Sequence, residues 1–121
     1  MLFDTTILID YLRGLEPARA FLERGDKQPN ISVASVLELY AGLRNRREER
    51  QTEQLLSQAT LLPVSLDIAK RAGIFVRIYE RSHSIGSIDA IIAATAEHHG
   101  LRLATLNTKH FPMFPKLKPA Y

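Results

Sequence analysis

The chain has 121 residues, of which 45% are hydrophobic and 24% charged, the composition of one ordinary globular domain with its own core. It contains no cysteine, which excludes a disulfide framework, a thiolate nucleophile and a zinc finger. Lys and Arg outnumber Asp and Glu by 16 to 13, and the resulting net charge of +3 permits a polyanionic partner without requiring one.

The N-terminus indicates where the protein works. Asp4 places an acid where a secretion signal would carry positive charge, and no apolar run approaches the length of a membrane span. We therefore expect a single cytoplasmic domain over residues 1–121 with no membrane partner.

The first third of the chain predicts two strands and two helices. Residues 1–4 predict a buried strand ending at Asp4, and residues 6–13 predict a helix that ends at Gly14. A second helix is expected over residues 16–24, because its proline suits a first turn, followed by a polar turn at 25–30. Residues 31–34 predict the second strand.

The middle of the chain is more charged. Residues 44–53 mix arginine and glutamate, which predicts a solvated helix with ion pairs at spacing three and four; the alternative is a basic stripe for phosphates. Residues 61–64 predict a third strand, and Pro63 favours an edge position or a strand start. Ser65 is expected to cap a long helix over residues 66–82.

The helix over residues 87–99 has the clearest boundaries. Ser87 is expected to cap it, and Gly100 to end it in the left-handed conformation. One apolar face, repeating at three and four, should enter the core: Ile88, Ile91, Ile92, Thr95 and His99. Residues 102–106 predict a fourth strand, and the pattern allows a short fifth strand near Leu117.

Short strands alternating with longer helices predict an α/β fold: a central, mostly parallel sheet of four to five strands with helices on both faces. In such sheets ligands bind outside the carboxyl ends of the strands, where the strand order reverses. Three acids and one amide are predicted at that edge: Asp4, Glu38, Asp89 and Asn107.

If these side chains converge, three carboxylates share one site, and they need a cation to remain ionised together. Oxygen-only ligands suit Mg²⁺, with Mn²⁺ as the alternative. The chemistry available to such a site is attack of metal-activated water on a phosphodiester.

Three of the four candidates also have a structural explanation. An acid at Asp89 would interact with the helix dipole, a contribution of about 0.3 to 1 kcal/mol. Ser35 and Glu38 match a capping box, and Asn107 suits a turn after a strand. Asp10, inside the first helix, is expected to be a solvent-exposed or rim acid rather than a ligand.

Other sites have weaker support. The hydroxyls of Thr5, Thr6 and Thr105 either cap and close turns or hold metal-bound waters. His98 and His99 point about 100° apart on a helix and cannot chelate one ion together. His83 and His110 have no partner at the sequence spacing of metal ligands. The usual motifs of NTPases, serine hydrolases and dinucleotide-binding proteins are absent from the sequence.

Four segments together resemble the PIN-domain ribonucleases, and more narrowly the VapC-type toxins of toxin–antitoxin pairs. They are residues 2–14 around Asp4, residues 32–42 around Glu38, residues 89–96 from Asp89, and residues 105–111 around Asn107. Their order and spacing span the chain, and this makes the resemblance far more specific than any single acid.

The resemblance implies that Asp4, Glu38 and Asp89 are metal ligands. Asn107 matches a position that is often aspartate, so its neutral amide would orient a water or a substrate oxygen, and no preformed second metal site is implied. The resemblance further implies Mg²⁺-dependent endonucleolytic cleavage of RNA, a homodimer, and inhibition by a small antitoxin. A docking surface for that antitoxin could include Tyr11, Leu12, Leu15 and Phe21, which could equally be core residues.

Three alternatives remain at this stage. A phosphoryl-accepting receiver domain has a similar architecture, but an acid pair is missing after the first strand and a lysine after the last. A non-catalytic RNA- or protein-binding domain would have little reason to keep three neighbouring carboxylates. A PIN nuclease of RNA maturation differs from a toxin only in its substrate and genomic context.

Overall fold

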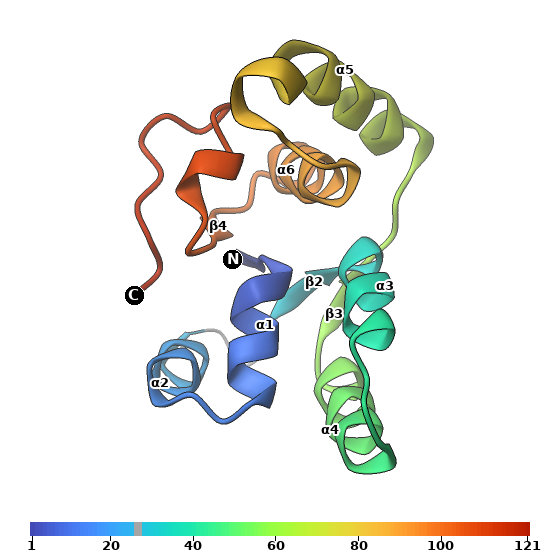
Figure 1. Cartoon of the computed structure of the whole chain (residues 1–121), viewed down its shortest axis with the longest axis vertical. Helices are drawn as coiled ribbons and strands as arrows, with labels where there is room; N and C mark the ends of the chain where they lie inside the picture. The colour runs from blue at the N-terminus through green and yellow to red at the C-terminus, as the bar shows by residue number, and fades with distance from the viewer. Residues whose placement is uncertain (26–27) are drawn as a thin grey trace.

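The computed structural model describes residues 1–25 and 28–121, in which short strands alternate with helices (Figure 1). The strands are β1 (Leu2–Phe3), β2 (Asn30–Ser32), β3 (Thr60–Leu62) and β4 (Leu103–Ala104). The α-helices are α1 (Thr5–Leu12), α2 (Glu16–Arg24), α3 (Val33–Ala41), α4 (Arg46–Ser57), α5 (Leu66–His83) and α6 (Ser87–His99). A 3-10 helix, η1, covers Thr108–His110.

The four strands form one sheet in the order β3-β2-β1-β4, and every neighbouring pair is parallel. This confirms the predicted mostly parallel sheet, and β3 lies at its edge. The predicted third strand over residues 61–64 is shifted, because β3 covers Thr60–Leu62 and Pro63 follows it. Because the strands are parallel, their carboxyl ends meet at one side. The chain builds β2 and β3 on one side of β1 and β4 on the other, so the strand order reverses at β1.

The two residues of β1 show how both faces of the sheet are covered. Leu2 and Phe3 are adjacent in a strand and therefore point to opposite faces. Leu2 packs in a buried cluster with α5 and α6, whereas Phe3 packs in a second cluster with residues of α1, α3 and α4. Figure 1 shows α5 and α6 at one end of the view and α1, α2 and α4 at the other. The predicted helices on both faces are confirmed.

Helix α6 is buried over more of its circumference than the predicted stripe requires. Ile92 and Thr95 are fully buried as predicted, and small side chains on other faces are buried too: Ala90, Ala93, Ala94 and Ala96. These alanines allow α5 and the sheet to approach α6 closely. His99 is exposed, contrary to the prediction, because the last turn of the helix extends past the core.

The ends of α6 match the prediction only in part. Gly100 ends the helix with φ +62°, in the left-handed conformation expected of it. The N-cap is Gly86, without a side-chain hydrogen bond, so the prediction that Ser87 caps the helix is wrong. The helix covers residues 87–99 as predicted, and Ser87 is its first residue rather than its cap.

The junction of β2 and α3 also differs from the prediction. The hydroxyl of Ser32 accepts the backbone N–H of Ala34 at 3.1 Å, so the strand ends at Ser32 and the helix begins at Val33. Ser35 therefore lies inside α3. The predicted capping box of Ser35 and Glu38 is wrong, which removes the structural explanation for Glu38.

The C-terminal segment contains no fifth strand in the part of the chain that the structure describes. Instead, Ala120 donates its N–H to the carbonyl of Thr105 at 2.9 Å, and the Tyr121 hydroxyl donates to Asp10 at 2.9 Å. Burial, together with this hydrogen bond to Asp10, raises the pKa of Tyr121 to about 12. Asp10 thus holds the end of the chain. Residues 26 and 27, part of the predicted polar turn at 25–30, lie outside the described residues.

The structure contains a predicted ion pair and the predicted cap of the long helix. Arg44 pairs with Glu48 at spacing four beside α4, and Ser65 caps α5 by accepting the N–H of Ile68. Within the described ranges, every helix is too short or too polar to cross a bilayer.

Candidate metal centre

Asp4 lies at the carboxyl end of β1, where the strand order reverses. The register pairs Phe3 with Ala104, so the next residues, Asp4 and Thr105, stand opposite each other. The N–H of Asp4 continues the ladder by donating to the carbonyl of Ala104 at 2.9 Å. Asp4 is also the N-cap of α1 and is only 3% exposed.

Three donors orient the Asp4 carboxylate. The N–H of Thr5 donates to Oδ1 at 2.8 Å, and the hydroxyls of Thr6 and Thr105 donate to Oδ2 at 3.0 and 2.7 Å. A carboxylate oxygen offers two lone-pair sites. Both sites on Oδ2 are therefore used, whereas Oδ1 keeps one that can accept a ligand.

Thr105 connects Asn107 to Asp4. Its hydroxyl accepts the backbone N–H of Asn107 at 2.9 Å while it donates to Asp4, and its side chain is fully buried. The side chain of Asn107 is exposed and makes no hydrogen bond to any described residue. The backbone of Asn107 thus supports the site, and its amide side chain remains available.

Thr5 connects Asp4 to Glu38. Its hydroxyl oxygen lies 2.6 Å from Oε1 of Glu38 and 2.9 Å from Oγ of Ser35. Thr5 has only one hydroxyl proton, and a carboxylate can only accept. Thr5 therefore donates to Glu38 and accepts from Ser35, so one residue orients both acids through its N–H and its hydroxyl.

Asp89 occupies the first turn of α6, with its side chain 24% exposed and Oδ2 lying 3.2 Å from Nδ1 of His110. Burial raises the pKa of Asp89, the negative charges of Asp4 and Glu38 raise it further, and His110 acts in the opposite direction. The helix dipole alone would lower this pKa.

The charges of Asp4 and Glu38 act on Asp89, but the three carboxylates of these described residues do not enclose one point. Among residues 1–25 and 28–121, no three His, Asp or Glu side chains surround one point closely enough to hold an ion. The hydrogen bond from Thr5 holds Glu38 in its orientation. The donor set itself, carboxylate and amide oxygens, fits a hard divalent cation.

Sequence reasoning missed the contact of His110 with Asp89. His110 ends η1, the 3-10 helix that follows β4 and Asn107. Of the side chains considered for docking a partner, Tyr11, Leu12 and Phe21 are half-buried against the second core cluster. Leu15 is exposed.

Known proteins are similar to this chain in sequence and in fold. A family model described as the PIN domain matches residues 1–116. Ribonuclease VapC10 of Mycobacterium tuberculosis is 46% identical over 100% of this chain and 92% of its own length, and ribonuclease VapC19 of the same species is 42% identical over 99% and 98%. A toxin–antitoxin complex from Klebsiella pneumoniae has 36% identity and a TM-score of 0.83, covering 99% of this chain and 97% of that one. The chain therefore belongs to the PIN-domain family and, within it, to the VapC ribonucleases.

Proposed function

We propose that this protein is a cytoplasmic, Mg²⁺-dependent endoribonuclease and the toxin of a toxin–antitoxin pair. The observation that carries the proposal is the proximity of three acids near the reversal of the strand order: Thr5 links Asp4 to Glu38, and the charges of both raise the pKa of Asp89. Within the described part of the chain, no Lys or Arg forms an ion pair with any of them. Such a site needs a cation, and Mn²⁺ would satisfy the same oxygen donors.

The residues have distinct roles in this proposal. Asp4, through its free Oδ1 lone pair, would hold the ion together with Glu38 and Asp89. A bound Mg²⁺ supplies Lewis-acid activation of water and neutralises charge at the scissile phosphate. Thr105 keeps Asp4 in one orientation, and the free amide of Asn107 orients a water or a substrate oxygen.

The proposed protein partner is a small antitoxin. The similar solved structure from Klebsiella pneumoniae is a toxin–antitoxin complex, and it covers nearly all of this chain. We propose that the antitoxin inhibits the nuclease by covering Asp4, Glu38 and Asp89, with the exposed Leu15 on the α1–α2 side available to contact it.

We also propose a homodimer, because α3 presents an apolar stripe to solvent. Val33, Leu37 and Tyr40 repeat at spacing four and three, and Leu37 is 63% exposed. Leu37→Glu is expected to convert a dimer into a monomer, because it places a charge at the centre of the interface. Light scattering after size-exclusion chromatography would measure this. Leu66→Glu, which changes a similarly exposed leucine on α5, should leave the dimer intact; a monomeric wild type would contradict the proposal.

The nuclease proposal is tested on total cellular RNA with Mg²⁺ or with EDTA. Wild type should produce discrete fragments only with Mg²⁺. Glu38→Gln should cut at least about 10- to 100-fold more slowly. Loss of a group that only supports a metal ligand already reduces metal affinity or activity by this factor, and Glu38 is itself a proposed ligand. The amide oxygen can still accept the Thr5 hydroxyl, and no helix cap depends on Glu38, so the fold should be retained.

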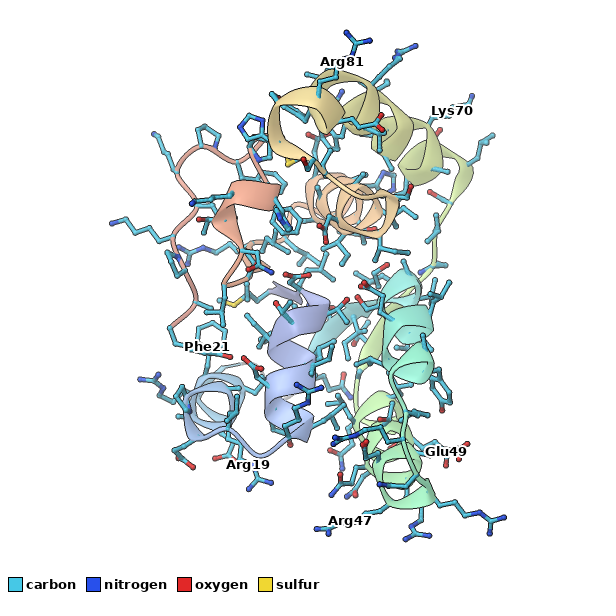
Figure 2. All side chains as sticks on the ribbon, in the orientation of Figure 1. Arg19, Phe21, Arg47, Glu49, Lys70 and Arg81 are labelled. Carbon is cyan, nitrogen blue, oxygen red and sulfur yellow. The ribbon has the colours of Figure 1, made fainter. Side chains whose placement is uncertain are left out.

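Glu49→Gln is the matched control, because it makes the same change on the exposed face of α4 (Figure 2). It should cut at the wild-type rate. Cleavage by wild type in EDTA, or equal rates for wild type and Glu38→Gln, would reject the metal site.

A further inference from the structure

We infer that the groove beside Glu38 binds the phosphates of the RNA strand on one side of the cleavage site. This inference rests on the proposed function and deepens it. The groove has a volume of about 410 Å³ and lies between the end of α1, the start of α2, α3 and α4. Its charged lining consists of Glu38, Glu48, Arg13, Arg19, Arg44 and Arg47.

The charges of this groove are not balanced by its own acids. Arg44 donates through Nε to both carboxylate oxygens of Glu48, at 2.8 and 3.1 Å. That hydrogen bond lowers the pKa of Glu48, and the nearby charge of Arg13 adds to the effect. Glu48 is thus already paired, and Glu38 accepts from Thr5 at the metal centre.

Three guanidinium groups consequently have no ion-pair partner among the residues described. They are Arg13 at the end of α1, Arg19 on α2 and Arg47 on α4. Figure 2 shows Arg19 and Arg47 projecting at the same end of the molecule, far from Lys70 and Arg81 on α5. Arg19 lies against the turn between α1 and α2: its Nη2 atom would be 4.0 Å from a Cβ atom placed on Gly14.

A polyanion fits this arrangement better than a small anion. If the scissile phosphate lies at the acids, the neighbouring phosphates must leave the site along the surface, and this groove starts at Glu38 itself. Guanidinium groups bind phosphate through paired N–H donors. The three free arginines therefore provide successive contacts for the strand that leads away from the cleavage site.

The test replaces the three arginines together, as Arg13→Gln, Arg19→Gln and Arg47→Gln. Binding of a fluorescein-labelled single-stranded RNA of mixed sequence is measured by anisotropy in EDTA, so that neither cleavage nor metal contributes. Each phosphate contact adds about 0.7 to the slope of log affinity against log salt. The triple variant should therefore lose about 2 from the slope magnitude and on the order of 100-fold in affinity near 0.1 M salt.

The matched control changes three cations on α5, Lys70→Gln, Arg77→Gln and Arg81→Gln, for the same loss of net charge. It should keep the wild-type slope, and thermal melting should show that both triple variants are folded. The inference is overturned if the groove variant keeps the wild-type slope, if both variants lose it equally, or if the groove variant loses antitoxin binding alone. In each of these cases Mg²⁺-dependent cleavage by wild type would leave the proposed function standing, whereas a wild type that cuts no RNA would overturn both.

Discussion

Asp4→Asn and Asp89→Asn should each reduce Mg²⁺-dependent RNA cleavage by on the order of 10³-fold, while they change the stability of the metal-free protein in opposite directions. The loss of cleavage follows from the several kcal/mol that a bound ion contributes at the transition state, since each 1.36 kcal/mol is about tenfold in rate. Stability differs because the two carboxylates have different surroundings.

Asp89→Asn should stabilise the metal-free protein at neutral pH. The pKa of Asp89 is raised from its ordinary value of 3.8 by burial and by the charges of Asp4 and Glu38. The folded state therefore holds the Asp89 proton to higher pH than the unfolded state, so stability falls as pH rises through that interval. Asparagine carries no charge, and its advantage over wild type should appear as pH rises above 3.8 and disappear below it.

Asp4→Asn should instead lower the free energy of unfolding by about 1 to 3 kcal/mol, the cost of leaving a buried polar group without its partner. The Oδ2 atom of Asp4 accepts two hydroxyl protons, from Thr6 and Thr105. An amide nitrogen at that position can only donate, so both hydroxyls lose their acceptor. The Oδ1 position can still accept the N–H of Thr5.

Urea unfolding in EDTA, across a range of pH, measures both effects. Mg²⁺ at a free concentration of about one hundred times its dissociation constant should then raise the free energy of unfolding of wild type by about 2.7 kcal/mol. The same Mg²⁺ concentration should stabilise each variant by less. Equal stability changes for the two variants, or wild-type stabilisation by Mg²⁺ in both, would show that these acids do not form the proposed site.

Thr105→Val should weaken Mg²⁺ binding by roughly 10- to 100-fold, although Thr105 is not itself a proposed ligand. Valine has nearly the same shape, so the fully buried side chain leaves no cavity. The substitution removes one donor to Asp4 and the acceptor of the Asn107 N–H. We expect a loss of about 1 to 3 kcal/mol in the free energy of unfolding.

Thr105→Ser is the matched control, because it keeps the hydroxyl and removes only a methyl group, at a cost of about 0.8 kcal/mol. Calorimetric titration with Mg²⁺ distinguishes the two variants. Serine should bind the ion as wild type does, and valine should not. If both variants bind Mg²⁺ like wild type, the hydrogen bond from Thr105 does not position Asp4 for metal binding.

The sequence by itself determined the elements and the edge at which the acids lie. The apolar run ending at Asp4 and the left-handed Gly100 were both readable locally, because each depends on the conformational preference of a few neighbouring residues. The alternation of short strands and helices was enough to predict a parallel sheet covered on both faces.

Some local signals were ambiguous between neighbouring residues. Ser32 and Ser35 both suit a helix start, and only the pairing of β2 with β1 and β3 decided that the strand ends at Ser32. Gly86 and Ser87 present the same choice at α6. In each case the difference between two starts one or a few residues apart is small locally, and packing selects one.

Only the tertiary structure decided how the site is held. Thr105 meets Asp4 across 101 residues and Thr5 meets Glu38 across 33, while His110 turns back onto Asp89. The groove of free arginines likewise joins α1, α2 and α4. No period of two or 3.6 residues encodes these contacts, because they depend on which strands pair and how far each helix reaches. Sequence pattern therefore located the acids, and the packing of distant elements determined what orients them and what surrounds them.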